Sequence, residues 1–147
     1  MFKFSDNFDL TSDNSNMILK IIEKNPGDNV MLPFYWFDIL VNNTAVGKIS
    51  IRIGDNFHSY YNGHIGYEID EAHRGNRYSL QALKLVLPVA KQHGMNSIYL
   101  TCKADNLASK RIIELAGAAH IRDVVPPKEY FAWYEGIEPT GIFRLEL

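Results

Sequence analysis

The chain has 147 residues, 46% of them hydrophobic, and carries a formal net charge of −2 at pH 7. This length predicts one domain over residues 1–147, with enough apolar side chains for a substantial core. The near-neutral charge argues against nucleic acid as the main partner, because that role needs a basic face. The apolar runs are too short to span a bilayer, so a membrane partner is not expected.

The cysteine and histidine residues indicate the cellular compartment and limit the possible metal sites. Cys102 is the only cysteine, so no intrachain disulfide can form. The first residues lack the basic and apolar pattern of a signal peptide. Together these features predict a cytoplasmic protein. The five histidines show no metal-ligand spacing, so no metal is expected.

The first half of the chain predicts a meander of strands. Residues 17–24 fit a strand or a short helix, whereas residues 34–41 are aromatic and β-branched and predict a strand. Residues 45–54 alternate, which predicts a half-buried strand in a hairpin with the preceding one. Residues 55–63 are expected to form a loop, and residues 63–70 the next strand of the meander. The alternation assigns one side of the 45–54 strand to Val46, Lys48, Ser50 and Arg52, and the other to Gly47, Ile49, Ile51 and Ile53.

The second half predicts helices that alternate with strands. Residues 78–93 carry apolar side chains at helical spacing, and Gly94 is a natural stop for that helix. A short strand at 96–102 and a capped helix at 107–117 follow, and the chain closes with a strand at 141–147. A strand–helix–strand unit of this kind is right-handed with parallel strands. The sequence therefore predicts an α/β fold with a mixed sheet and helices packed on its faces.

A turn rich in cations stands between the third strand of the meander and the long helix, where residues 74–79 read Arg-Gly-Asn-Arg-Tyr-Ser. Backbone N–H groups at a helix N-terminus are unpaired and carry partial positive charge, so a turn that lets them converge binds an anion. Gly75 gives the turn conformational freedom. Arg74 and Arg77 add guanidinium groups that suit phosphate oxygens, and Ser79 offers a hydroxyl. This pattern predicts a phosphate site.

Judged from the local residues alone, a plainer interpretation of the same turn is equally well supported. Arg74 and Arg77 can be solvated charges near a strand end, with Gly75 an ordinary turn glycine. Two familiar phosphate loops are excluded, because the chain has neither G-x-x-x-x-G-K-[ST] nor G-x-G-x-x-G between a strand and a helix. Local sequence alone leaves both interpretations open.

From about residue 46 to residue 147, two motifs and the order of the elements resemble the GCN5-related N-acetyltransferases, the GNAT superfamily. The family signature [Q/R]-x-x-G-x-[G/A] opens its main helix. Here Arg74 takes the first place and Ser79 the final small residue, whereas Arg77 stands where glycine is usual. A second pattern, N-x-x-[AS] through to a terminal G-[FA], is met by Asn106, Ser109, Gly117 and Ala118.

The resemblance implies both a fold and a co-substrate. The fold is a GNAT-like acyl-CoA N-acyltransferase fold, whose central, mostly antiparallel sheet has splayed parallel strands and flanking helices. The co-substrate is acetyl-CoA, with its pyrophosphate held by the amides of the turn and its pantetheine arm in the splay. The residues expected to bind it are Ile69, Asp70, Arg74, Gly75, Asn76, Arg77, Tyr78, Ser79, Asn106 and Ser109.

The chemistry requires a neutral amine, so a general base must remove a proton from the ammonium. A period of two places His64 and Glu68 on one face of the 63–70 strand, and both are candidate bases. The competing interpretation of Glu68 is an exposed carboxylate on a strand edge. The competing interpretation of His64 is a turn histidine with a local hydrogen bond.

The general acid departs from the family pattern. Many members carry a tyrosine seven residues after the motif asparagine, which protonates the departing thiolate. Here that position is Ile113. Tyr134 and Tyr130 lie in the stretch where family members build the acceptor pocket, and either is a candidate replacement. A packing role is the alternative for both.

Two functions are consistent with these expectations. The first is an acetyltransferase that moves the acetyl group of acetyl-CoA to a primary amine of a small molecule or peptide, by direct attack in a ternary complex. The second is a catalytically weak acyl-CoA-binding or sensor domain on the same fold, which Arg77 and Ile113 favour slightly. The sequence does not name the acceptor, and a homodimer is left open.

Overall fold

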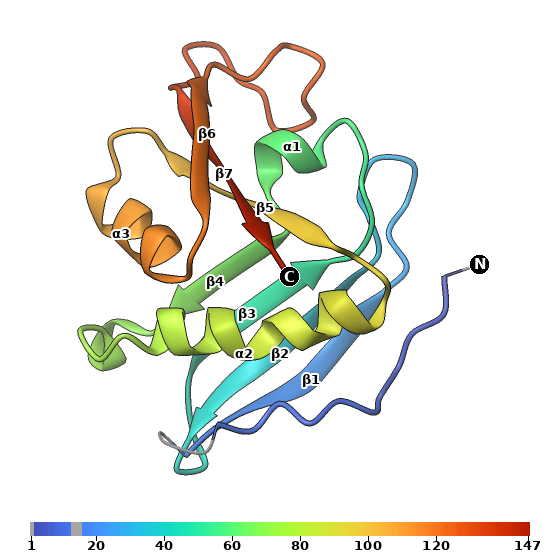
Figure 1. Cartoon of the computed structure of the whole chain (residues 1–147), viewed down its shortest axis with the longest axis vertical. Helices are drawn as coiled ribbons and strands as arrows, with labels where there is room; N and C mark the ends of the chain where they lie inside the picture. The colour runs from blue at the N-terminus through green and yellow to red at the C-terminus, as the bar shows by residue number, and fades with distance from the viewer. Residues whose placement is uncertain (1, 13–15) are drawn as a thin grey trace.

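The computed structural model describes residues 2–12 and 16–147. Figure 1 shows two groups of strands with a long helix between them. In chain order the elements are β1 (Met17–Asn25), β2 (Phe34–Val41), β3 (Thr44–Arg52), α1 (Ser59–Asn62), β4 (Ile65–Ile69), a 3-10 helix (Glu71–His73), α2 (Tyr78–Gln92), β5 (Ser97–Lys103), α3 (Leu107–Leu115), β6 (Ala119–Val124) and β7 (Thr140–Glu146).

The first sheet is an antiparallel meander in the order β1-β2-β3-β4. For residues 17–24 the sequence is consistent with a strand or a short helix, and the structure has the strand. The expected hairpin of β2 and β3 is confirmed. Asn42 and Asn43 form the hairpin turn, both with positive φ, at 49° and 66°. Asparagine tolerates this conformation, and a two-residue turn of this kind matches the twist of the flanking strands.

A β-bulge in β3 changes one predicted face assignment. Ala45 pairs with Leu40 and Gly47 with Ile39, which leaves Val46 between them without a partner. Val46 is 2% exposed and belongs to the hydrophobic core. The prediction that grouped Val46 with Lys48 is therefore wrong, because alternation fails where an extra residue enters a strand.

The predicted loop at residues 55–63 is also partly wrong, because it contains the one-turn helix α1. Two reciprocal hydrogen bonds hold the turn: the Ser59 N–H donates to Asn56 Oδ1 at 2.9 Å, and the Asn56 N–H donates to Ser59 Oγ at 3.1 Å. Such side-chain bonds stabilise a helical turn that has no hydrophobic period of its own.

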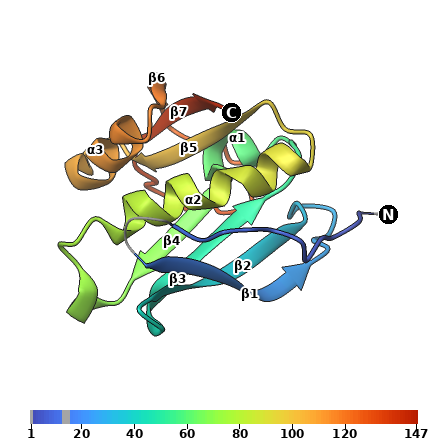
Figure 2. The same cartoon turned by 60° about the horizontal axis from the view of Figure 1, so that its bottom comes forward.

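Helix α2 covers one face of the first sheet, and Figure 2 shows α3 and β5 on the far side of this helix. The apolar side chains of α2 and the inward faces of the strands make the core. Fully buried members include Leu83 and Val86 of α2, Phe37 of β2 and Ile49 of β3. No helix in the described part of the chain is both long and apolar enough to cross a membrane.

The second sheet has the antiparallel order β5-β7-β6 and is separate from the first. β4 and β5 share no ladder; one backbone bond, from the His64 N–H to the Tyr99 carbonyl at 2.8 Å, joins the chain just before β4 to β5. From that point the two strands diverge (Figure 1). The expected α/β fold with splayed strands is thereby confirmed, and the single mixed sheet is divided into two by the splay.

Candidate active site

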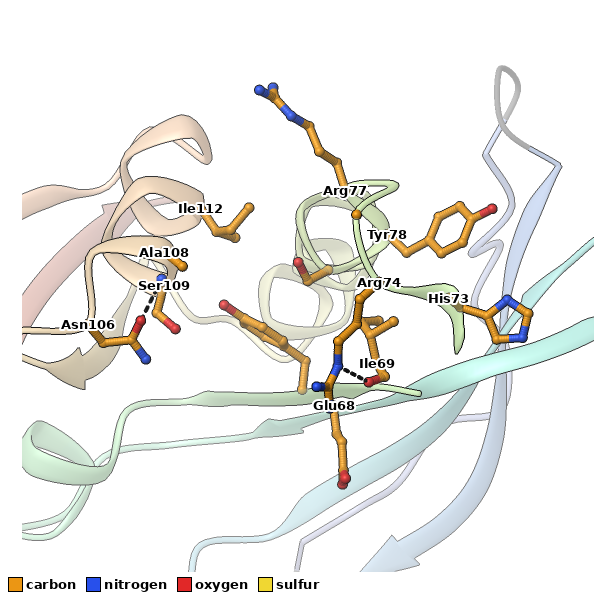
Figure 3. A pocket seen from close by; sticks show the side chains of 13 residues that line it. Glu68, Ile69, His73, Arg74, Arg77, Tyr78, Asn106, Ala108, Ser109 and Ile112 are labelled. Carbon is orange, nitrogen blue, oxygen red and sulfur yellow. Dashed lines mark hydrogen bonds between the residues drawn. The ribbon is translucent and has the colours of Figure 1, made fainter. Parts of the chain in front are cut away.

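A cavity of about 540 Å³ lies between β4, the start of α2 and α3. The cavity opens where β4 and β5 have diverged. The two strands no longer form a continuous sheet there, so the space between them is not filled. Figure 3 shows its walls. The lining residues are Tyr67, Glu68, Ile69, His73, Arg74, Gly75, Arg77, Tyr78, Ser79, Asn106, Ala108, Ser109 and Ile112.

The turn before α2 presents a run of free backbone donors. Among the described residues, none accepts a hydrogen bond from the N–H groups of residues 75–80. The first paired amide of the helix is that of Gln81, which donates to the Arg77 carbonyl at 3.1 Å. Unpaired amides at a helix N-terminus attract anions through both hydrogen bonding and the helix dipole.

Two residues with positive φ shape this turn. Gly75 has φ 90°, and a Cβ there would meet no atom within 4 Å. Arg77 is the N-cap of α2 in the left-handed region, with φ 58° and ψ 27°. Figure 3 shows its side chain extending away from Arg74. The position where the family has glycine thus keeps a glycine-like backbone.

Hydrogen bonds fasten the turn to the strand before it. Arg74 Nε donates to the Ile69 carbonyl at 3.0 Å, which ties the turn to the end of β4. Asn76 Nδ2 donates to the His73 carbonyl at 3.1 Å. These bonds hold the free amides in one arrangement before any ligand arrives.

Asn106 forms the opposite wall as the N-cap of α3. Its Oδ1 accepts from the Ser109 N–H at 3.1 Å (Figure 3). Because the carbonyl oxygen of the side chain is used by the cap, the Nδ2 group remains as a donor toward the cavity.

The structure brings together nearly all of the predicted cofactor residues. All of them except Asp70 and Asn76 line the cavity. Asp70 uses its N–H to bond the Val46 carbonyl at 2.8 Å, and Asn76 is occupied within the turn. Tyr67 lines the cavity too and was not predicted. Its signal was the period of two, which places it on the same face of β4 as Ile69.

Glu68 lies at the boundary of the cavity with its carboxylate directed elsewhere. Figure 3 shows it pointing to the opposite side of β4 from Tyr78 and Ser109. There it faces a second hollow of about 230 Å³, which Asp38 and Lys48 also line. Glu68 is paired in register with Lys48 on the neighbouring strand.

His64 is placed away from both hollows. It is fully buried at 0% exposure, its Nδ1 accepts from the Tyr99 N–H at 2.9 Å, and its Nε2 lies 2.8 Å from the Gly54 carbonyl. Burial is the main cause that lowers the pKa of this imidazole below its ordinary value. With both nitrogens engaged, the geometry of His64 fits a structural tie and opposes a role as general base.

The two candidate acids from the C-terminal half do not reach the cavity either. Tyr134 is 51% exposed and Tyr130 is 8% exposed, and neither lines it. Tyr130 donates its hydroxyl to Asn62 Oδ1 at 3.2 Å. Its ring also packs near His58 and Tyr61. These contacts favour the packing interpretation of Tyr130.

Comparisons with known proteins agree with this geometry. The family model of the acetyltransferase (GNAT) domain matches residues 4–119. This match covers most of the chain and shows that it belongs to the GNAT family of acetyltransferases, whose members use acetyl-CoA as co-substrate. Among curated proteins, no sequence matches the chain.

Solved structures share the fold at low sequence identity. RimL, a ribosomal L7/L12 alpha-N-protein acetyltransferase in complex with coenzyme A, is 19% identical, with a TM-score of 0.61 over 78% of this chain and 62% of that one. An acetyltransferase from Salmonella typhimurium that modifies the N-terminal serine of L7/L12 is 14% identical, with a TM-score of 0.59 over 78% and 64%.

The microcin C7 self-immunity acetyltransferase MccE, in complex with acetyl-CoA and AMP, is also similar. It is 17% identical, with a TM-score of 0.59 over 78% of this chain and 61% of its own. The chain therefore spans less than two thirds of the length of each of these three structures.

Proposed function

We propose that this protein transfers the acetyl group of acetyl-CoA to a primary amine of a small molecule or a peptide, by direct attack. The observation that carries the proposal is the row of unpaired amides at residues 75–80. These residues lie beside a cavity of about 540 Å³. Free N–H groups and guanidinium groups are the donors that a diphosphate prefers.

The residues of the cavity fit the diphosphate and the pantetheine arm of acetyl-CoA. The amides of the turn and Arg74 hold the diphosphate at the start of α2. The exposed backbone of β4 and the side-chain amide of Asn106 hold the pantetheine arm between them, as an added strand is held at a sheet edge. When bound, the co-substrate supplies an acetyl group already activated as a thioester.

The acceptor amine approaches from the other side of β4. Glu68 directs its carboxylate there, so it is placed to take a proton from the ammonium, directly or through a water molecule. The nearby Asp38 adds a second carboxylate, and both attract a positively charged amine. The Salmonella typhimurium acetyltransferase named above modifies the N-terminal serine of L7/L12, and an N-terminal amino group is a primary amine.

Two observations favour a second function, because one candidate base is unsuitable and the usual tyrosine acid is missing. His64 is sequestered, and Ile113 stands where many members have the tyrosine acid. A domain with these features could bind acyl-CoA as a sensor and catalyse weakly. The two functions share the cofactor site and differ only in turnover.

Calorimetry with CoA and a thiol-release assay with acetyl-CoA separate the outcomes. We expect saturable CoA binding and thiol release that depends on an added primary amine from a panel of small amines and peptides. Binding without amine-dependent release would favour the sensor. A lack of binding would overturn both functions.

The variant Arg74→Glu sharpens this test. Replacing a cation beside the diphosphate with an anion should lower CoA affinity by at least about tenfold, since charge-assisted hydrogen bonds contribute about 1.5–3 kcal/mol. Arg111→Glu is the matched control, because Arg111 is exposed on α3 and does not line the cavity. Equal losses in both variants would mean that only general surface charge matters.

A further inference from the structure

The gap between β4 and β5 has a closed end and an open end. The backbone bond between His64 and Tyr99 closes it, and it is open at Ile69. Tyr67 stands between these two points and lines the cavity. A ligand held at the start of α2 and lying along β4 therefore reaches Tyr67 before the gap closes, so the reactive end of such a ligand comes to rest beside this side chain.

The phenol of Tyr67 lies among groups from two further elements. A hydrogen bond from the Ser109 side chain on α3 reaches it, and the Cys102 thiol of β5 is close enough to act on its charge. Tyr67 is partly buried against the core. The Tyr67 side chain thus reaches from β4 toward α3 within the cavity.

The phenol stays protonated at working pH. Burial raises the pKa of Tyr67 above its ordinary value, and the Ser109 hydrogen bond only partly offsets this rise. The Cys102 thiol of β5 is the titratable group that acts on the Tyr67 phenol, and Lys110 of α3 and Asp123 of β6 act in turn on that thiol. The other charged or titratable groups that line the cavity are Glu68, His73, Arg74, Arg77 and Tyr78.

No other phenol in the described part of the chain has this position. Ile113 has no transferable proton, and Tyr130 and Tyr134 lie outside the cavity. Tyr78 lines the cavity at the first residue of α2, where the amides place the diphosphate. Tyr67 is the phenol that remains.

Resting on the proposed acetyl transfer, we propose that Tyr67 is the catalytic proton donor to the departing sulfur. As the amine nitrogen forms its bond to the acetyl carbon, the carbon–sulfur bond breaks and its electron pair passes to sulfur. Tyr67 gives its phenolic proton to that sulfur, which leaves as a thiol. The proton lost by the amine nitrogen passes to Glu68 or solvent, and solvent returns a proton to the phenolate.

Tyr67→Phe tests this role with a readout that does not depend on turnover. The thiolate absorbance of bound CoA is titrated with pH in the wild type and in the variant. Because a phenol that donates to sulfur stabilises the thiolate, we expect its loss to raise the pKa of the bound CoA thiol by about one unit. Binding of desulfo-CoA, which lacks the sulfur, should be unchanged in calorimetry.

Turnover gives the second measurement. Loss of a positioned proton donor should lower kcat about 100-fold, with little change in the KM for acetyl-CoA. Tyr130→Phe is the matched control, because Tyr130 is also buried with a raised pKa but lies outside the cavity. It should leave the titration of the bound thiol as in the wild type.

The outcomes distinguish this proposal from the proposed function. If CoA binds and the thiol titrates identically in wild type and Tyr67→Phe, the donor role is wrong while acetyl transfer stands. If CoA does not bind the wild type, both fail.

Should Tyr67→Phe not fold, Ser109→Ala keeps the phenol and removes the bond that lowers its pKa. We then expect the high-pH decline of kcat to move to higher pH, and an unmoved decline would overturn the role.

Discussion

At the scale of single residues, backbone conformation in the turn matters as much as charge. Arg77 occupies a left-handed conformation that costs a non-glycine residue about 1–3 kcal/mol, and the fold supports it through the N-cap position of α2. The departure from the family signature therefore adds a side chain that extends away from Arg74 (Figure 3), while the backbone at this position keeps a glycine-like conformation.

Gly75→Ala separates the conformational cost of this turn from its role in binding. Alanine at φ 90° should lower the free energy of unfolding by about 1–2 kcal/mol, although its Cβ meets no atom within 4 Å. Because the strain is relieved by moving the amides, CoA affinity should fall as well. Urea unfolding and calorimetry measure the two effects.

Gly136→Ala is the control for that variant, because Gly136 has φ 84°, equally open surroundings and no place in the cavity. It should show a similar loss of stability with unchanged CoA affinity. If Gly75→Ala bound CoA as tightly as Gly136→Ala does, the amides of the turn would not be the diphosphate site.

The residue scale also shows where sequence motifs are informative. Arg74, Gly75 and Asn106 were predicted because a motif fixes their spacing. Tyr67 was not, because an aromatic residue on an alternating strand is indistinguishable from a core residue until the neighbouring strand is seen to diverge. His64 was predicted to share a face with Glu68, yet it precedes β4 and turns inward to Gly54 and Tyr99.

At the scale of elements, the approach of β3 to β4 fixes the strand that carries the site. A Cβ at Gly47 would lie 2.2 Å from the Glu68 carbonyl and 2.9 Å from the Ile69 Cα. Both are backbone atoms, so neither can move without shifting β4. The close packing at Gly47 therefore sets the position of the edge along which the pantetheine arm is proposed to lie.

Gly47→Ala should destabilise the protein by about 1–3 kcal/mol, the usual range for overpacking, and should weaken CoA binding because β4 is displaced. Gly66→Ala on the paired strand is the control. A Cβ at Gly66 would meet Ser50 Oγ at 3.3 Å and an Arg52 side-chain nitrogen at 3.7 Å, both of which can move. Thermal unfolding of the two variants compares them directly. Equal stability would contradict this account of the β3–β4 contact.

Periodicity predicted most elements and missed those that depend on single side chains. β2, β3, α2 and α3 carry long apolar patterns, and all four were expected near their observed positions. α1 was missed because reciprocal bonds between Asn56 and Ser59 make it, with no repeat to detect. The bulge at Val46 was missed because one extra residue inverts an alternation without altering composition.

At the scale of the whole molecule, the cavity exists because two sheets meet at one point and separate. The strand–helix–strand order predicted that β4 and β5 would lie near one another, and the family resemblance added the splay. No local pattern could supply its extent, since it depends on the absence of a ladder between two strands far apart in sequence. The His64–Tyr99 pair fixes where the sheets join.

This junction should make the fold sensitive to acid. The folded protein keeps His64 neutral because burial lowers its pKa below 6.5, so below that pH the unfolded chain binds more protons than the folded one. Stability therefore falls as the pH drops from about 6.5 toward the lowered pKa. Each unit of difference between the two pKa values corresponds to about 1.4 kcal/mol.

His64→Gln, which offers an amide donor and acceptor and does not titrate, should unfold at lower temperature than the wild type at pH 7.5 but lose less stability between pH 7.5 and 5.5. Some acid dependence remains, because burial also lowers the pKa of His93. His73→Gln, on the 3-10 helix, is the control and should follow the wild type. If His64→Gln lost as much stability between pH 7.5 and 5.5 as the wild type does, His64 would not be the cause of the acid sensitivity.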